Sequence, residues 1–360
     1  MKIVVCGLAI TSSWGNGHAT TYRALARALQ ARGHDIVFFE RDLEWYASNR
    51  DMPGPPFCKV HIYERWDDVR TLVRRELDRA DVGVIGSYFP DGTAAADELL
   101  ESSASVKAFY DIDTPITVSK LQAGDQEYLR CDQVAGFDIY FSFTGGPMLD
   151  EIKTRFGARR VVPLYCSFDP SRYRLCAVDQ QYRCDLSYMG TYAPDRQEKL
   201  EELLFEPAKR LEAKRFIVAG PQYPRDIRWP GNVSHIVHLE PKFHPPFYCS
   251  SRFTLNLTRK HMVNVGYSPS VRLFEAAGCG AAIISDDWEG LETFFVPGQE
   301  ILLSNSSDEV VRYLEGISDE DALKIGRRAQ DRVLAEHSAE KRAIQFEEFV
   351  EAKTLASQYA

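Results

Sequence analysis

The chain has 360 residues, of which 44% are hydrophobic and 26% charged, and its formal net charge at pH 7 is -9. This length is more than one hydrophobic core usually holds, so we expect two domains of ordinary size. The acidic balance and the lack of a Lys/Arg-rich run disfavour a nucleic-acid surface and an anionic membrane face.

The start of the chain and its cysteines indicate the compartment. The N-terminus, MKIVVCGLAI, has a short apolar run without a small-residue cleavage site, which predicts a buried strand rather than a signal peptide. No run approaches the roughly 20 apolar residues of a membrane-spanning helix. Eight cysteines are scattered without CxxC pairs or Cys/His metal spacing, which favours reduced thiols. We therefore expect a cytoplasmic protein with no integral membrane association and no metal site.

The first part of the chain alternates strand-like and helix-like segments. The segment 18–33 has apolar residues three and four positions apart and ends at Gly33, which predicts a helix with a glycine C-cap. Alternation of this kind implies a parallel sheet with right-handed crossovers. We therefore predict a Rossmann-like N-terminal domain over residues 1–167, with strands at 2–9, 34–41, 82–88, 106–113, 138–144 and 161–167.

After residue 167 the pattern changes and then resumes. Residues 168–184 are polar, dotted with aromatic side chains and without periodicity, which favours a connection between domains. A second alternating series follows, and it predicts a second Rossmann-like domain over residues 185–335. Residues 336–360 are expected to form a helix that packs back on the first domain. The predicted fold class is α/β, with two doubly wound domains facing a cleft. In the second domain we expect helices at 195–212 and from Ser268, and strands at 185–192, 214–223, 233–240, 252–259 and 281–287.

The helix that begins near Ser268 predicts an anion site. Ser268 is a suitable N-cap, Pro269 suits the first helical position, and Ser270 adds a hydroxyl in the first turn. The free N–H groups and the positive end of the helix dipole favour a bound phosphate. Arg272 also lies in the first turn, where its charge is unfavourable for the helix alone. An anionic ligand would reverse that penalty.

Small residues follow in the same helix, in the sequence FEAAGCGAA. One interpretation is tight packing of the helix on a sheet. The other is close approach of a ligand, and Glu275 in this segment favours it. A carboxylate at this place would accept hydrogen bonds from the two hydroxyls of a ribose, while the helix N-terminus holds a diphosphate.

Residues 274–292 resemble the donor-site segment of GT-B glycosyltransferases, which has a Glu before an Ala/Gly-rich helix, a strand, and a Gly-containing loop that ends in Glu. The stretches GTYAPDRQ, FIVAGPQYP, RFTLNLTR and YSPSVRLFEAAGCG resemble the bacterial branch related to spore-maturation glycosyltransferase-like (CgeB-like) proteins. The resemblance is specific over residues 185–298 and only architectural over 1–167. Many retaining members carry two Glu residues seven positions apart, and here Tyr267 stands where the first would be, so the stereochemical outcome does not carry over.

The resemblance implies further donor-side residues. Gly190, beside Thr191, is expected to let the backbone approach the diphosphate, and Arg196 is expected to neutralise it, although a turn glycine and a solvated helix arginine would look the same. Arg259 ends a predicted strand, at the edge where open α/β sheets bind ligands, and a surface salt bridge is the equal alternative. The base pocket is expected to be lined by Gly220, Pro221 and Leu239, the last through its backbone.

The segment TSSWGNGH carries the candidate catalytic base. It lacks the G-x-G-x-x-G fingerprint, which weakens a dehydrogenase interpretation. His18 resembles the base of inverting GT-B members in a similar GH context, and a pKa near the working pH suits that role. The alternative is a histidine that caps the following helix. Asp111 and Asp113 are expected to orient His18 or to hold acceptor hydroxyls, or they only form a turn.

These residues predict transfer of a sugar from a nucleoside-diphosphate donor to a hydroxyl acceptor. The cations near Ser268 would stabilise the charge on the departing diphosphate, so no metal is needed, and the only co-substrate is the nucleotide sugar. One alternative is a sugar-nucleotide epimerase of the same fold, which needs no acceptor. The other is a non-catalytic protein that binds sugar nucleotides, an interpretation that Tyr267 favours. The identity of the sugar, base and acceptor and the oligomeric state are not predicted.

Overall fold

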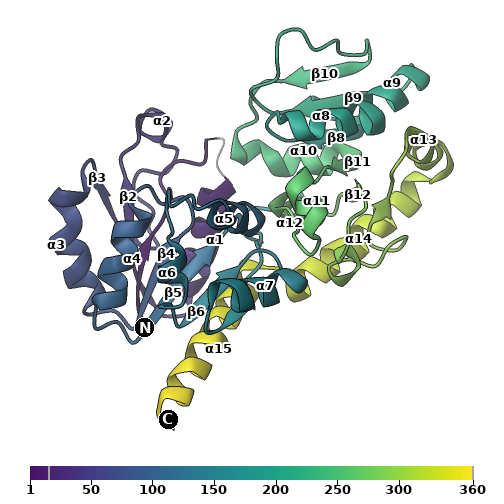
Figure 1. Cartoon of the computed structure of the whole chain (residues 1–360). Helices are drawn as coiled ribbons and strands as arrows, with labels where there is room; N and C mark the ends of the chain where they lie inside the picture. Colours follow the sequence, from purple (N-terminus) through teal and green to yellow (C-terminus); the bar gives the residue numbers. More distant parts are fainter. Residues whose placement is uncertain (15–16, 359–360) are drawn as a thin grey trace. The chain divides into compact units, whose positions relative to one another are not determined.

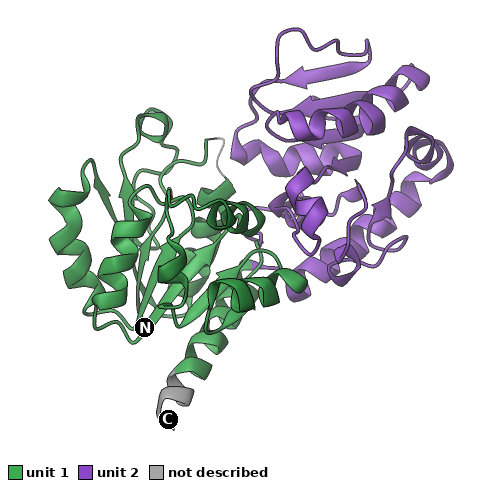
Figure 2. Ribbon diagram, viewed as in Figure 1, with its two compact units in different colours: residues 1–166, 339–360 green, residues 167–338 purple. Residues whose placement is uncertain are grey.

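The computed structural model describes residues 1–14 and 17–358. The chain folds into two compact units, shown in green and purple in Figure 2. Unit 1 comprises residues 1–166 and 339–360, and unit 2 comprises residues 167–338. Each unit is built around one parallel β-sheet, as the alternating pattern of the sequence predicts.

The sheet of unit 1 has seven parallel strands in the order β3-β2-β1-β4-β5-β6-β7. Strands β2, β3, β4, β5 and β6 are labelled in Figure 1. The order reverses between β1 and β4, and open α/β sheets bind ligands outside the carboxyl ends of the strands at such a point. Strand β3 was not expected, because its sequence KVHIY mixes charged and apolar residues at the sheet edge. The strands are β1 Lys2–Cys6, β2 Asp35–Arg41, β3 Lys59–Tyr63, β4 Val82–Gly86, β5 Val106–Asp111, β6 Ile139–Ser142 and β7 Val161–Pro163.

The long C-terminal helix α15 belongs to unit 1, although it follows unit 2 in the sequence. Glu347 on α15 accepts hydrogen bonds from Arg32 at 2.7 and 2.6 Å and lies 2.6 Å from Nε2 of His34. Phe346 stacks on Phe141 of β6. The helices of unit 1 are α1 Gly17–Ala31, α2 Glu44–Ala47, α3 Trp66–Leu77, α4 Gly92–Glu101, α5 Thr114–Gln122, α6 Cys131–Val134, α7 Pro147–Phe156 and α15 Ala339–Gln358.

The sheet of unit 2 has six parallel strands in the order β10-β9-β8-β11-β12-β13. Its order reverses between β8 and β11, which places a second switch point there. The two-residue strand β13 was not expected, since it is too short to show a period. The strands are β8 Cys184–Met189, β9 Phe216–Ala219, β10 Val233–Ile236, β11 Ser251–Asn256, β12 Ala282–Ser285 and β13 Leu302–Leu303.

The helices of unit 2 depart from the expected pattern at one place. The single helix expected over 195–212 is interrupted by a π-helical turn at Glu201–Phe205. The cause is Pro207, which has no N–H for the regular ladder and whose ring crowds the preceding turn. The helices are α8 Pro194–Leu200, α9 Glu206–Arg210, α10 His244–Ser250, α11 Lys260–Val265, α12 Val271–Gly278, α13 Ser307–Gly316 and α14 Asp319–Glu336, with 3₁₀ turns at Pro241–Phe243 and Leu291–Thr293.

Residues 168–184, which we expected to connect the domains, lie within unit 2. Their aromatic side chains explain the difference, because Phe168, Tyr173 and Tyr182 are buried. A Cβ atom on Gly278 would lie 2.5 Å from the ring of Phe168, so the ring packs directly on the end of α12. The segment 336–360 is also divided, since residues 336–338 belong to unit 2 and unit 1 resumes at Ala339.

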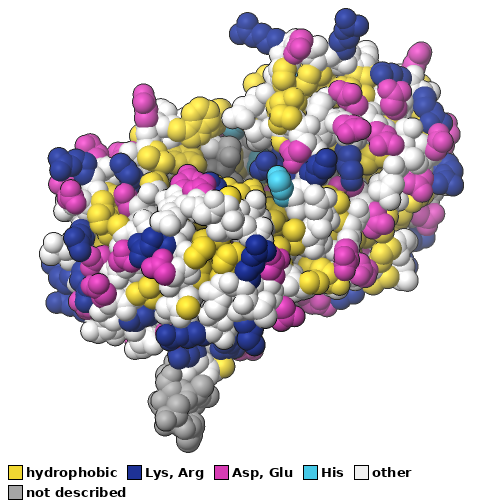
Figure 3. All heavy atoms as spheres, in the orientation of Figure 1, with side chains coloured by type: hydrophobic (Ala, Val, Ile, Leu, Met, Phe, Trp, Pro, Cys, Tyr) yellow, Lys and Arg dark blue, Asp and Glu magenta, His cyan; other side chains and the backbone are white. Residues whose placement is uncertain are grey.

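The surface carries charges of both signs. On the face shown in Figure 3, Lys and Arg side chains are interspersed with Asp and Glu side chains. Across the described residues, every helix is too short or too polar to cross a lipid bilayer.

Candidate functional site

The helix α12 starts at Val271 with Ser270 at the N-cap position, so the expectation that Ser268 caps it is wrong by two residues. Ser268 is buried, and its hydroxyl contacts Sδ of Met262 at 3.1 Å. The hydroxyl of Ser270 donates to Oδ1 of Asn256 at 2.8 Å instead of capping the helix. Because Asn256 is the last residue of β11, this bond anchors the helix N-terminus at the carboxyl edge of the sheet.

Arg272, in the first turn of α12, spans the switch point of unit 2. Its guanidinium donates to the carbonyl oxygen of Met189 at 2.8 Å, at the end of β8, and to that of Leu257 at 3.0 Å, just after β11. It also donates to the hydroxyl of Tyr188 at 3.2 Å and lies 5.5 Å from the centre of that ring. All these partners are neutral, so the charge of Arg272 has no carboxylate bonded to it among the hydrogen bonds and ion pairs of the described residues.

Two further arginines join Arg272 in what we call the arginine cluster, Arg196, Arg259 and Arg272. Arg196, in the first turn of α8, donates from Nη2 to the carbonyl of Thr191 at 2.6 Å. Its Nε is buried without a hydrogen-bond partner in the described structure. Burial, and then the charges of Arg272 and Arg259, lower the pKa of Arg196. Arg259 is half-exposed, with Nε 3.6 Å from Oδ2 of Asp195. Guanidinium groups that repel one another in this way would be stabilised by an anion.

Glycines bring two strand-end loops close to this cluster. The N–H of Gly190, after β8, donates to the carbonyl of Ala219 at 2.8 Å, at the end of β9. A Cβ atom on Gly190 would lie 2.6 Å from Nη1 of Arg272, and one on Gly220 would lie 2.0 Å from the carbonyl oxygen of Gly190. The carbonyl of Pro221 accepts from the N–H of Tyr192 at 3.0 Å. Only glycine therefore allows the two loops and the guanidinium to approach this closely.

We expect Gly220→Ala to reduce the free energy of unfolding by about 1–3 kcal/mol, the usual cost of forcing atoms into a packed region. The new methyl group would meet the backbone of Gly190, which cannot move as a side-chain tip can. The control is Gly231→Ala, because a Cβ atom at Gly231 meets no atom within 4 Å. Urea unfolding of both variants measures the difference. Equal stability of the two variants would contradict the packing described here.

Glu275 lies further along α12 and is buried. Burial raises its pKa to about 7, while a hydrogen bond from Tyr173 and the charges of Arg172 and Arg272 act in the opposite direction. The hydroxyl of Tyr173 is 3.2 Å from Nδ1 of His244, whose Nε2 is 3.2 Å from the carbonyl oxygen of Leu239. A chain of polar contacts therefore joins Glu275, the residue expected at the ribose, to Leu239, the residue expected at the base.

Tyr267 occupies the position of the missing first carboxylate and has a left-handed backbone, with φ of 47°. Its N–H donates to the carbonyl of Glu289 at 2.6 Å. A Cβ atom on Gly290 would lie 2.4 Å from the Tyr267 ring, so the ring packs on the loop that follows β12. In the same loop Asp286 is fully buried and accepts from the N–H and hydroxyl of Thr258 at 3.1 and 3.0 Å. Its carboxylate therefore ties this loop to the end of β11.

In unit 1 the structure brings His18 and Asp113 together. Nε2 of His18, near the start of α1, lies 2.9 Å from Oδ2 of Asp113. The ring of Tyr88 meets that of His18 edge-on, with centroids 5.8 Å apart. His18 follows β1 and Asp113 follows β5, so both stand at the carboxyl edge of the sheet. This pair has the geometry of a histidine oriented by a carboxylate.

Asp111, the other expected acid, lies in the core. It is fully buried and accepts from the hydroxyls of Thr117 at 2.6 Å and Tyr140 at 2.5 Å. Burial raises its pKa to about 7, although these two hydrogen bonds act to lower it. These hydrogen bonds in the core give Asp111 a structural role rather than contact with His18.

Several residues of the candidate site did not stand out in the sequence. Tyr188 and Asn256 lie inside strands and were interpreted only as strand residues. Tyr173 falls in the segment expected to connect the domains. The one available signal was the position of Tyr188 two residues before Gly190, which places both on the same side of a strand end. Within residues 1–14 and 17–358, no three His, Cys, Asp or Glu side chains have an arrangement that would hold a metal ion.

Comparison with known proteins gives a family match in the second half of the chain. Residues 196–348 match the family described as "Glycosyl transferase-like". A comparison with curated proteins gave no match. The matched range contains all three residues of the arginine cluster, Glu275 and Tyr267.

Solved structures resemble the whole chain. A sucrose-phosphate synthase from Thermosynechococcus elongatus is 13% identical, with 99% of both chains covered and a TM-score of 0.69. Alr3699/HepE from Anabaena, in complex with UDP and glucose, is 11% identical, with 98% of this chain and 100% of that chain covered and a TM-score of 0.70. An alpha-glucosyltransferase in complex with UDP-glucose and DNA containing an abasic site is 11% identical, with 98% and 99% covered and a TM-score of 0.70.

At these identities the similarity shows the fold, which consists of two parallel-sheet α/β domains as in GT-B glycosyltransferases. The family match and the UDP-sugar complexes of the neighbours support the prediction of an enzyme that uses a nucleotide sugar. The chain as a whole therefore has the GT-B fold, and residues 196–348 match a glycosyl transferase-like family.

Proposed function

We propose that this protein transfers a sugar from a nucleoside-diphosphate donor to a hydroxyl-bearing acceptor without a metal ion. The observation that carries the proposal is Arg272, whose guanidinium joins the ends of β8 and β11 and has only neutral hydrogen-bond partners in the described structure. Arg196 adds a buried Nε that has no hydrogen-bond partner among the described residues. A diphosphate at this switch point would compensate both charges.

The chemistry follows from where charge develops. When the bond between the anomeric carbon and the diphosphate breaks, negative charge grows on the departing phosphate oxygen. Fixed cations and helix N–H groups that face this charge lower the barrier, because they need no reorganisation during the reaction. In this proposal the arginine cluster and the N-terminus of α12 supply that stabilisation. Glu275 accepts hydrogen bonds from the ribose, and the backbone at Gly220, Pro221 and Leu239 receives the base.

His18 is the proposed base. A neutral imidazole carries one N–H, and with that proton on Nε2 donated to Asp113 the lone pair lies on Nδ1. Nδ1 would take the proton of the acceptor hydroxyl as its oxygen attacks the anomeric carbon. Asp113 stabilises the imidazolium that forms, because the two groups are 2.9 Å apart.

The proposal also covers the branch and the compartment. The motifs around residues 185–298 support a relation to the spore-maturation glycosyltransferase-like proteins. No cysteine of the described residues is in a disulfide, which supports a reducing, cytoplasmic environment. UDP-sugars are the first donors to test, since two similar solved structures contain UDP or UDP-glucose.

Thermal unfolding with UDP, GDP, ADP, dTDP and CDP tests the donor site. A nucleotide at a hundred times its dissociation constant adds about 2.7 kcal/mol to stability, so one nucleotide is expected to raise Tm clearly. The matching nucleotide sugar is then incubated with hydroxyl acceptors and the released diphosphate is measured. Failure of all five nucleotides to bind would contradict the proposal. Release of diphosphate with a rearranged sugar and no need for an acceptor would instead identify an epimerase.

We expect His18→Ala to reduce kcat by about 10²- to 10⁴-fold, the usual contribution of a positioned base. The Kd for the nucleotide should not change, because His18 belongs to unit 1 and the nucleotide is assigned to unit 2. Asp113→Asn should reduce kcat less and change its pH profile. Asp111→Asn is the matched comparison, since its effect should appear in stability. Unchanged kcat in a folded His18→Ala protein would remove the base assignment.

A further inference from the structure

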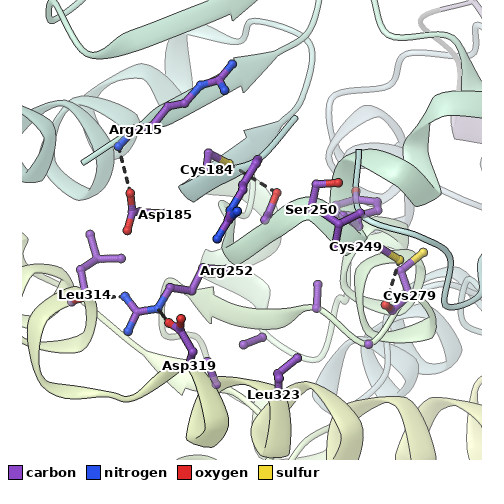
Figure 4. A pocket seen from close by; sticks show the side chains of 18 of the residues that line it. Cys184, Asp185, Arg215, Cys249, Ser250, Arg252, Cys279, Leu314, Asp319 and Leu323 are labelled. Carbon is purple, nitrogen blue, oxygen red and sulfur yellow. Dashed lines mark hydrogen bonds and ion pairs between the residues drawn. The ribbon is translucent and has the colours of Figure 1, made fainter. Parts of the chain in front are cut away.

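A large cavity lies at the opposite edge of the sheet of unit 2 from the arginine cluster. Its volume is about 1470 Å³, and it is bordered by the amino ends of β8, β11 and β12 (Figure 4). Cys184 and Ser251, the first residues of β8 and β11, line it, whereas Arg272 contacts the carboxyl ends of the same strands. The cavity is therefore distinct from the proposed donor site.

Three thiols from three segments meet at this cavity and all line it. Cys249 lies in α10, Cys279 directly follows α12, and Cys176 lies in the segment that precedes β8. Sγ of Cys249 is 3.4 Å from the carbonyl oxygen of Cys279 (Figure 4) and 3.7 Å from that of Arg174. The thiols of Cys176 and Cys279 are also hydrogen-bonded to Cys249. Exposure decreases from Cys176, which is exposed, through Cys249 to Cys279, which is buried.

The donors around Cys249 favour its thiolate. The thiol of Cys279, and then the backbone N–H and thiol of Cys176, point to its sulfur and lower the pKa of Cys249, although burial opposes them. The pKa values of the two neighbouring thiols are shifted upward instead. Contact with Cys249 and burial raise the pKa of Cys279, and burial and contact with Cys249 raise that of Cys176. The thiolate is the reactive form of cysteine, so the lowered pKa favours reaction at Cys249 over its two neighbours in the cluster.

We propose that Cys249 is a site of oxidation by peroxide and that Cys176 is its resolving partner, so that the two close a reversible disulfide at the edge of the cavity. The Cys249 thiolate attacks one peroxide oxygen, the O–O bond breaks, and the leaving hydroxide takes a proton to become water. The resulting sulfenic acid is attacked by the sulfur of Cys176, which forms the S–S bond and releases a second water. The two thiols lose two electrons and two protons in total, and these reduce hydrogen peroxide to two waters.

Cys176 is the resolving partner rather than Cys279 because of access and anchoring. Cys176 is exposed in a segment outside the regular helices and strands, so its sulfur can move to the Cys249 sulfur. Cys279 is buried at the end of α12, where its N–H donates to the carbonyls of Glu275 and Ala276. A transient disulfide of this kind is compatible with a reducing compartment, where such bonds act as redox sensors.

The test treats the reduced full-length chain with hydrogen peroxide and maps disulfides by mass spectrometry of a non-reduced digest. We expect loss of two thiols per chain, a cross-linked peptide pair containing Cys176 and Cys249, and reversal by dithiothreitol. Iodoacetamide at pH 7 should label Cys249 before Cys131. Cys131 is the internal control, because it is exposed and its thiol donates to the carbonyl of Leu121 at 3.6 Å, away from the cysteines of the cavity.

Variants separate the roles of the three thiols. Cys176→Ser should leave Cys249 as a sulfenic acid that dimedone traps, and Cys249→Ser should prevent the cross-link at Cys176. Cys131→Ser should oxidise as the parent chain does. A cross-link between Cys249 and Cys279 would overturn the assignment of Cys176. If Cys131 is oxidised while Cys176 and Cys249 both remain thiols, the whole proposal is wrong. Nucleotide binding is not involved, so these outcomes do not depend on the proposed enzymatic function.

Discussion

Replacing Arg272 by alanine is expected to weaken UDP binding by about 10- to 150-fold, while the affinity for uridine changes little. Hydrogen bonds to charged groups contribute about 1.5–3 kcal/mol, and this range corresponds to that change in Kd. The loss should be confined to the diphosphate, because Arg272 contacts the strand ends and the helix N-terminus rather than the residues assigned to the base. Isothermal titration with UDP and with uridine measures the difference.

Stability has to be controlled in this experiment. Arg272→Ala leaves the carbonyl oxygens of Met189 and Leu257 without their donor, which costs free energy of unfolding as well. Arg196→Gln reduces this problem, since Arg196 donates to one carbonyl instead of two and its buried Nε has no hydrogen-bond partner in the described structure. It should weaken UDP binding in the same direction. Arg312→Ala on α13, where the arginine is 70% exposed, is the matched control. Equal losses for UDP and uridine would contradict the phosphate role.

Glu275→Gln is expected to stabilise the ligand-free protein at pH 8 and at the same time to weaken nucleotide binding. The pKa of Glu275 is about 7 in the folded protein, against an ordinary value near 4.5, because burial disfavours the charged form. A raised carboxyl pKa stabilises the fold fully below pH 4.5, and this stability is lost as the pH rises through 7. At 1.36 kcal/mol per pKa unit the loss is about 3 kcal/mol. Glutamine carries no charge at any pH in this range, so the variant does not lose this stability as the pH rises.

Urea unfolding from pH 4 to 9 measures this effect as the difference between variant and parent. That difference should grow in favour of Glu275→Gln as the pH rises. Asp111→Asn is a matched control in unit 1, because burial also raises the pKa of Asp111 to about 7. It should show the same pH dependence and no loss of affinity for UDP. If Glu275→Gln binds UDP as tightly as the parent, Glu275 does not hold the ribose.

The sequence predicted the strands that are completely buried, and the prediction failed for a strand that is only partly buried. Central strands such as β4 are buried at every position, and a continuous apolar run is the expected sequence of such a strand. The edge strand β3 is buried only at Tyr63, so its sequence keeps charged and polar residues that hide the pattern. Pro207 was visible, but whether a proline ends a helix or is accommodated by a π turn depends on the packing around it.

The candidate site shows the same division at the level of single residues. Ser268 and Ser270 have the same side chain and both suit an N-cap. Ser270 takes the N-cap position because its hydroxyl donates a hydrogen bond to the amide oxygen of Asn256 at the end of β11. Asp111 and Asp113 are equally acidic and two positions apart, yet one meets Thr117 and Tyr140 in the core and the other meets His18. Local sequence cannot distinguish such pairs.

The sequence by itself determined the alternation of strands and helices, and therefore two parallel sheets with their carboxyl edges and the loops that carry Gly190, Arg196 and Glu275. These features follow from hydrophobic period and residue type, which are local properties. The tertiary structure alone decided which groups meet. Arg272 bonds to carbonyl groups 83 and 15 residues away in the chain, and the thiols that surround Cys249 come from segments on either side of it. Contacts of this kind depend on strand order and register, which no local pattern records.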